Sequence, residues 1–236
     1  MIVVNTFCAS MRKQKTFKLC DLPFKDTKLN VLILNASLKH AKEGSNTGEL
    51  ADLVVGKMRD FADVKSVHIR LSDKDIPVGL GYKETETDEW PSIVEEIKKA
   101  DIVLFATPIW WSGHSSLMQR VIERFDAFDE DYLLTSESVI YNKVAGIVIT
   151  GHEDGALATM GTLMKALTWF GFTLPPECGA YWVGEVGFPS DHDAEKRRAN
   201  ESTTTMAARL ARNLVYYAQL LKKYPLTQTN VGKLID

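Results

Sequence analysis

Short apolar runs alternate with amphipathic stretches from Leu29 onward, and this alternation constrains the fold more than any other feature of the chain. Runs that are apolar throughout are typical of parallel strands buried on both faces, and the stretches between them have helical periodicity. The apolar runs cover residues 29–35, 101–106, 144–149 and 179–183. Residues 63–70 alternate between apolar and polar, which suits a strand nearer the edge of the sheet. We therefore predict an α/β protein in which four or five parallel strands lie between layers of helices.

The amphipathic stretches predict helices over residues 47–61, 90–100, 115–128, 156–170 and 193–223. Asp191 or Asp193 is a candidate cap for the last helix, and Pro225 stops it. That helix carries an apolar stripe, which packs on the sheet by default and alternatively forms a subunit interface. The stripe consists of Leu210, Leu214, Tyr217 and Leu221.

The length of 236 residues suits one enlarged domain, which we place at 29–223 with a polar insertion near 129–142. Residues 1–28 form an N-terminal extension and residues 224–236 a tail. The net charge of −3 argues against a surface built for nucleic acid.

Cysteine usage bears on the compartment of the protein. Cys8, Cys20 and Cys178 lie too far apart in sequence for a metal or redox motif. Three scattered thiols suit a reducing compartment, where each acts as a small buried hydrophobe. No apolar run approaches the length of a secretory signal or a membrane span. We therefore expect a cytoplasmic protein without a metal site, and no membrane partner.

Hydroxyl and amide side chains follow the first predicted strand and lead directly into a helix. The segment 35–47 ends in Ser45, Asn46 and Thr47. A helix N-terminus offers unpaired N–H groups and the positive end of the helix dipole, which suit a phosphate dianion. The Walker and Gly-x-Gly-x-x-Gly motifs are missing, which disfavours a nucleoside triphosphate or a Rossmann-bound dinucleotide. The alternative is that these three residues only cap the helix.

Two adjacent tryptophans follow the third predicted strand. Trp110 and Trp111 leave the strand and enter a turn between Pro108 and Gly113. Ligands of open parallel sheets bind at the carboxyl ends of strands, where aromatic faces suit a planar ring. Alternatively, the tryptophans pack in the core or at an oligomer interface.

The segment 150–156 follows the fourth predicted strand. Gly151 and Gly155 allow a tight turn, and His152 is a candidate acid or base because histidine titrates near neutral pH. A solvated loop histidine is the alternative. Because all three segments follow apolar strands, we expect them to meet at one edge of the sheet. Their convergence predicts a ligand with a phosphate at one end and a flat aromatic system at the other.

These segments resemble the flavodoxin-like NADPH-dependent FMN reductase family, which includes NAD(P)H:quinone oxidoreductases and azo- and nitro-compound reductases. Asn-Ala-Ser at 35–37 with Ser-Asn-Thr at 45–47 is similar to the family's Gly-Ser…Asn-Thr phosphate loop. Thr-Pro-Ile-Trp-Trp-Ser-Gly-His at 107–114 is similar to its Ser-Pro-hydrophobic-Tyr-Trp-Gly/Ser loop. Residues 117–125 resemble its Leu-Lys-x-Phe-Ile-Asp-Arg helix.

The resemblance implies a three-layer α/β/α sandwich with a five-stranded parallel sheet in the order 2-1-3-4-5, and non-covalent FMN in a homodimer or homotetramer. It implies a ping-pong enzyme in which NADPH or NADH reduces FMN and departs before a small-molecule acceptor binds. The acceptor would be a quinone or a related flavin, azo or nitro compound. His152 is the candidate catalytic residue, and with Gly151 it is implied to contact the far side of the flavin ring or the substrate. The residues implied to hold FMN are Ser37, Lys39, Ser45, Asn46, Thr47, Pro108, Ile109, Trp110, Trp111, Ser112, Gly113, Thr150, Gly151 and His152.

Two other classes of protein stay open. A flavodoxin-type electron carrier would pass single electrons to protein partners, but such carriers are usually strongly acidic. A flavin-free protein would use the same sheet edge for regulation or partner contact, because a fold alone does not fix an activity.

Overall fold

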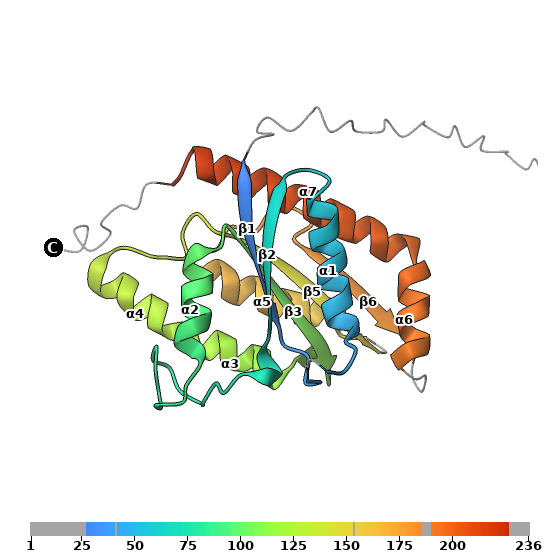
Figure 1. The fold of residues 1–236 in the computed structure, drawn as a ribbon, viewed down its shortest axis with the longest axis horizontal. Coiled ribbons are helices and arrows are strands. Elements are labelled where there is room, and N and C mark those ends of the chain that lie inside the picture. Colours follow the sequence, from blue (N-terminus) through green and yellow to red (C-terminus); the bar gives the residue numbers. More distant parts are fainter. Residues whose placement is uncertain (1–26, 41, 153, 186–189, 227–236) are drawn as a thin grey trace, which may run out of the picture.

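Five parallel strands form the centre of the molecule (Figure 1). The computed structural model describes residues 27–40, 42–152, 154–185 and 190–226. The parallel strands are β1 (Lys28–Asn35), β2 (Asp63–Arg70), β3 (Ile102–Trp110), β5 (Val144–His152) and β6 (Gly179–Gly184). Their order is β2-β1-β3-β5-β6, which confirms the predicted 2-1-3-4-5 arrangement. A short strand, β4 (Gly113–His114), pairs antiparallel with the end of β3.

Helices cover both faces of this sheet, as the flavodoxin-like three-layer fold requires. One face is covered by α1 (Asn46–Met58) and α7 (Glu201–Lys223). The other is covered by α2 (Trp90–Lys99), α3 (Ser116–Arg124) and α5 (Ala156–Trp169). Two shorter helices complete the fold: α4 (Asp126–Thr135) follows α3, and α6 (Ser190–Ala199) precedes α7. The predicted N-terminal extension and tail lie outside the described residues, except for residues 27, 28 and 224–226.

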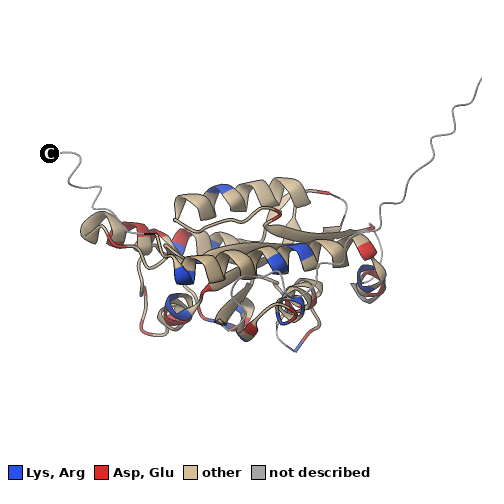
Figure 2. Cartoon of the chain, turned by 90° about the horizontal axis from the view of Figure 1, so that it is seen from above, with Lys and Arg blue, Asp and Glu red and all other residues tan. Residues whose placement is uncertain are grey.

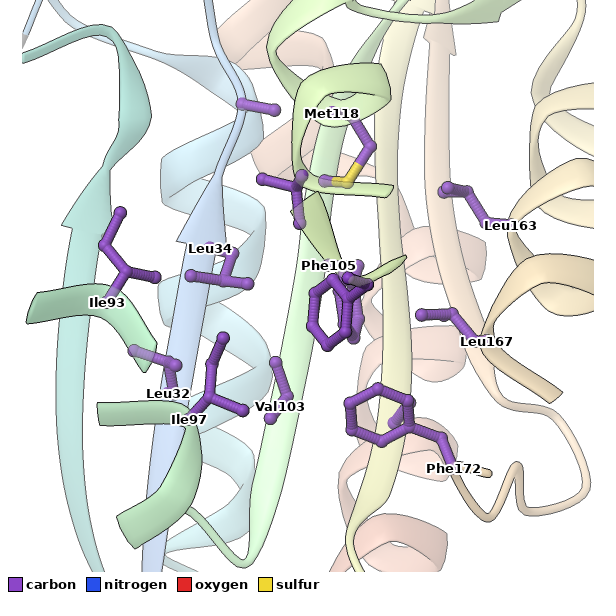
Figure 3. Packing of buried hydrophobic residues seen from close by; sticks show 14 of the residues in the cluster. Leu32, Leu34, Ile93, Ile97, Val103, Phe105, Met118, Leu163, Leu167 and Phe172 are labelled. Carbon is purple, nitrogen blue, oxygen red and sulfur yellow. The ribbon is translucent and has the colours of Figure 1, made fainter. Parts of the chain in front are cut away.

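Each layer of helices buries its own apolar cluster against the sheet. On the α2, α3 and α5 side, the ring centroid of Phe105 lies 5.4 Å from that of Phe172, in a cluster that also contains Val103 and Leu167 (Figure 3). On the other side, Leu210 and Leu214 of α7 are fully buried. The apolar stripe of the last helix therefore packs on its own sheet, which was the default expectation.

Two helices predicted to be continuous are interrupted, so these predictions were wrong. The stretch 115–128 breaks at Phe125, whose N–H is shared between the carbonyls of Val121 and Ile122. The new helix, α4, then runs to Thr135 through half of the predicted polar insertion.

The stretch 193–223 breaks at Asn200. This residue has an extended backbone, and its side chain accepts a hydrogen bond from the Thr203 N–H at 2.8 Å. Asn200 is thus the N-cap of α7. Asp193, a predicted cap, lies inside α6 instead.

The strands β3 and β5 are longer than predicted. The residues 107–110 were expected in a turn, but they pair with β5 as far as Pro108 and with β4 as far as Trp110. Pairing with β5 and then with β4 keeps this stretch extended although it contains a proline.

Charged residues of both signs are interspersed along the helices (Figure 2). No helix in the described part of the chain is long and apolar enough to cross a bilayer. Within the same ranges, no three His, Cys, Asp or Glu side chains come together as a metal site requires. Cys178 is buried, and burial raises the pKa of its thiol. Cys8 and Cys20 lie outside the described residues.

A buried ion pair fixes the long connection between β2 and α2. Arg124, at the end of α3, donates to Asp88 at 2.7 Å, and both side chains are fully buried. The same guanidinium donates to the carbonyls of Gly81 at 2.9 Å and Pro77 at 3.1 Å. Burial raises the pKa of Asp88, but hydrogen bonds from the Glu84 N–H, from Arg124 and from the Trp90 N–H outweigh burial and hold that pKa below its usual value. The carboxylate is therefore charged near neutral pH.

We predict that Arg124→Met lowers the free energy of unfolding by about 3 to 5 kcal/mol, because it leaves a buried charge without its partner. Arg120→Met is the matched control. Arg120 donates a hydrogen bond to the Ile76 carbonyl at 2.6 Å, so its loss is expected to cost about 1 kcal/mol. Urea unfolding of both variants measures the difference, and equal losses would contradict the anchoring role of Arg124.

Candidate active site

The first of the three predicted segments, residues 35–47, starts in a turn that is stabilised by a buried side-chain amide. Asn35 ends β1, and its Oδ1 accepts a hydrogen bond from the Ser37 N–H at 3.0 Å. The Ala36 N–H donates to the Ala106 carbonyl of β3 at 2.8 Å. The Ser115 hydroxyl donates to the Ala36 carbonyl at 2.7 Å. The first segment is thus tied to the second by backbone and side-chain hydrogen bonds.

The start of α1 brings the first segment to the third. Ser45 is the N-cap of α1, since its Oγ accepts from the Gly48 N–H at 3.1 Å. The capping interpretation therefore holds for Ser45. Thr47 has a further contact, because its hydroxyl lies 2.6 Å from the hydroxyl of Thr150 on β5. The first turn of α1, with its N–H groups and the positive end of the helix dipole, lies at these same residues.

The second segment, which holds the two tryptophans, is a tight hairpin between β3 and β4. Its two turn residues, Trp111 and Ser112, have φ of +47° and +63°. Turns of this kind require positive φ at both positions and usually hold Asn-Gly, so a tryptophan there is strained. Trp111 is 98% exposed and Trp110 is 51% exposed. The alternative that these tryptophans pack in the core is therefore wrong.

Two glycines let the third segment approach the second. A Cβ at Gly151 would lie 2.7 Å from the Cβ of Ile109. A Cβ at Gly155, whose φ is +91°, would lie 2.7 Å from the Cα of Ser112. Side chains at either position would therefore force the two segments apart.

His152 faces a buried carboxylate. Its Nε2 lies 3.5 Å from Oδ2 of Asp193, which also accepts from the Asn46 amide at 3.5 Å. The Asp193 side chain is 4% exposed, whereas that of His152 is 43% exposed. Gly184 leaves room for this carboxylate, because a Cβ there would lie 1.7 Å from Asp193 Oδ1. The histidine is thus open to a ligand on one side and faces an acid on the other.

The three segments enclose one cavity of about 530 Å³. All the site residues predicted from the sequence line it except Gly113, which lies in β4 outside the lining. Three further residues line the cavity: Leu38, Asp154 and Asp193. Leu38 and Asp154 lie within the predicted segments, so their place at the site follows from that of the residues beside them. Asp193 is the one that sequence reasoning missed, because its position near a predicted helix start favours a capping role.

Comparison with known proteins identifies relatives. Residues 29–185 match the family model of the NADPH-dependent FMN reductases. The chain is 31% identical over 208 residues to the 8-demethyl-8-aminoriboflavin-5'-phosphate synthase of Streptomyces davaonensis, a match that covers 84% of this chain and 80% of that protein. It is 34% identical over 204 residues to a protein of Mycobacterium bovis named as the divalent metal cation transporter MntH. That match covers 82% of this chain but only 29% of the M. bovis protein.

Among solved structures, the fold is similar to that of RosB with the bound intermediate 8-demethyl-8-formylriboflavin-5'-phosphate. The TM-score is 0.74 at 29% identity, and the match covers 87% of this chain and 84% of RosB. The family match covers more than half of the chain and includes all three segments of the cavity. The chain therefore belongs to the NADPH-dependent FMN reductase family.

Proposed function

We propose that this protein is an FMN-dependent oxidoreductase that uses NADPH or NADH to reduce quinones or related flavin, azo or nitro compounds. One observation carries the proposal. Three strand ends converge on a cavity that is lined by hydroxyl and amide side chains at the start of α1 and by two exposed tryptophans of the hairpin.

The cavity fits FMN in size and in chemistry. Its volume of about 530 Å³ lies in the range typical of cofactor sites. The α1 end supplies hydroxyls, a lysine and the start of a helix, which are groups that bind a phosphate. The hairpin end supplies apolar side chains beside a backbone that glycines hold close. A phosphate joined to a flat ring system matches both ends.

We assign the predicted residues to parts of FMN in this way. At the α1 end, the phosphate would contact Ser37, Lys39, Ser45, Asn46 and Thr47. At the hairpin, Pro108, Ile109, Trp110, Trp111 and Ser112 would line the isoalloxazine ring. From β5, Thr150, Gly151 and His152 would contact its far side.

FMN, when bound, would supply the redox chemistry between the nicotinamide and the acceptor. The residues of the hairpin and of β5 would orient its ring system. We propose that the nicotinamide and the acceptor occupy the cavity in turn, as a ping-pong enzyme requires. His152, with Asp193 behind it, is placed to hold or supply a proton at Nε2.

Anaerobic titration of the FMN-loaded protein with NADPH and then NADH tests this function. We predict that the yellow absorption bleaches with at least one of them and that added quinone restores it. Mass spectrometry of the recovered flavin is expected to show unchanged FMN. A flavin that neither nicotinamide bleaches would contradict the enzyme and favour an electron carrier.

We also predict that Thr47→Val weakens FMN binding by about 1.5 to 3 kcal/mol, the usual contribution of one hydrogen bond to a charged group. Thr203→Val is the control, because both threonines are 3% exposed and the Thr203 hydroxyl bonds the Tyr181 carbonyl away from the cavity. Equal FMN affinity in the two variants, measured by isothermal titration, would mean that the phosphate is misplaced.

A second candidate function rests on the S. davaonensis relative and on RosB, whose names describe chemistry on the flavin itself. In this function FMN is the substrate, and its 8-methyl group is changed. The same mass spectrometry separates the two candidates, because a flavin of altered mass after aerobic incubation would favour this one.

We further propose that the protein is a homo-oligomer that assembles through α5, a helix whose outer face holds one charged residue, Lys165. Leu157 and Trp169 on this helix are 70% and 84% exposed, and exposed apolar patches mark interaction sites. The scattered cysteines support a reducing, cytoplasmic location.

We predict that the wild type sediments as a dimer or tetramer and that Leu157→Glu shifts it toward the monomer. Leu133→Glu on α4 is the control, since Leu133 is 74% exposed and lies outside α5. A monomeric wild type in analytical ultracentrifugation would contradict the proposed assembly.

A further inference from the structure

A chain of three side chains leads from the surface of α1 to the first segment of the cavity. Asp52 Oδ1 lies 3.0 Å from His68 Nδ1, and His68 Nε2 lies 3.0 Å from Asn35 Nδ2. Oδ1 of Asn35 accepts from the Ser37 N–H at 3.0 Å. The Ser37 hydroxyl in turn accepts from the Lys39 N–H at 3.4 Å. The chain thus ends on two residues that line the cavity, Ser37 and Lys39.

The direction of each hydrogen bond in this chain is fixed. A backbone N–H only donates, so the amide of Asn35 must turn its oxygen toward Ser37. Its nitrogen then faces His68 and can only donate. Nε2 of His68 must therefore accept, which places the ring proton on Nδ1, where it is donated to Asp52. The geometry requires a neutral His68 with its proton on Nδ1.

The amide of Asn35 has little freedom to adapt. It is completely buried, and α1 packs directly on it at Gly48. A Cβ at Gly48 would lie 2.8 Å from Asn35 Nδ2 and 3.5 Å from His68 Cε1. A reversed amide would set its NH₂ group against the Ser37 N–H and leave both donors without an acceptor, which is costly inside a protein.

We propose that His68 is a positioning residue for the phosphate-binding segment, and that it acts through Asn35 only as the neutral ring with its proton on Nδ1. This inference rests on the proposed function, because Ser37 and Lys39 are residues that we place on the FMN phosphate. Protonation of His68 would oppose an N–H to the Asn35 NH₂ group and displace the amide that holds Ser37. FMN affinity would then fall as His68 becomes charged.

Charged groups lie near His68 on two elements. On α1, Asp52 contacts the ring at Nδ1, while Glu49, one turn earlier, is paired with Arg197 and Arg198 of α6. On β2, Arg70 lies two residues further along the strand on the same face, and it donates to the Lys39 carbonyl at 2.8 Å. Arg59 of the α1 end bonds Ser66 on that face at 3.1 Å.

The experiment compares FMN affinity from pH 8 to pH 5, the range in which histidine changes charge. We expect His68→Leu to bind FMN about tenfold more weakly at pH 8, because the Asn35 amide loses its acceptor. His68→Gln restores the acceptor with Oε1 and cannot become charged in this range, so it should bind like the wild type at pH 8. On acidification the wild type should lose at least about threefold more affinity than His68→Gln, while titration of the phosphate itself affects both proteins equally.

Gly48→Ala provides a variant in which the histidine is intact. Alanine favours the helix more than glycine does, so the fold is expected to persist while the displaced amide weakens FMN binding. Parallel pH profiles for the wild type and His68→Gln, or wild-type affinity in His68→Leu, would overturn the proposal.

The tautomer can be measured without any flavin. Long-range ¹H–¹⁵N NMR of the full chain should show His68 at pH 8 as the neutral ring with its proton on Nδ1. A proton on Nε2 would overturn the role of His68 whatever the protein binds. The expected tautomer in a protein that takes up no FMN would instead count against the proposed function, so the two failures are distinguishable.

Discussion

The parallel register of β1, β3 and β5 is the constraint on which the cavity depends. Asn35 pairs with Ala106, and Pro108 pairs with Thr150, so the three strands end side by side. Parallel strands send their chains out at the same edge, and three connections consequently meet there. A shift of one residue in either pairing would turn every side chain of the shifted strand to the opposite face of the sheet. The contact between the Thr47 and Thr150 hydroxyls would then be lost. The apolar clusters on both faces hold this register.

Unfavourable local features gather at the same edge. Trp111 and Ser112 have positive φ, and Asp193 is an acid with a buried side chain beside the cavity. Backbone strain of this kind persists only where the surrounding structure holds it in place, and a buried acid needs polar partners. Here the β3–β4 pairing fixes the hairpin, and His152 and Asn46 face the acid. The aromatic core and the Arg124 ion pair lie elsewhere and stabilise the fold that bears these features.

The fold and most of the cavity could be predicted from the sequence because both depend on local patterns. Apolar runs such as 144–149 define strands, and a parallel sheet brings their carboxyl ends together. The breaks at Phe125 and Asn200 were missed, since apolar periodicity continues across both. Asp193 was missed because its role depends on how α6 folds back over β6, which no local pattern records. The chain from Asp52 through His68 to Asn35 joins three elements, and only the folded structure brings them within hydrogen-bond distance.

The central claim is that the α1 end of the cavity binds the phosphate of FMN. Isothermal titration of the protein with FMN and with riboflavin, which lacks the phosphate, tests this claim most directly. Two hydrogen bonds to a charged group account for about a hundredfold difference in affinity, so we predict that FMN binds at least about a hundredfold more tightly at pH 8. Equal affinities for the two flavins would contradict the account.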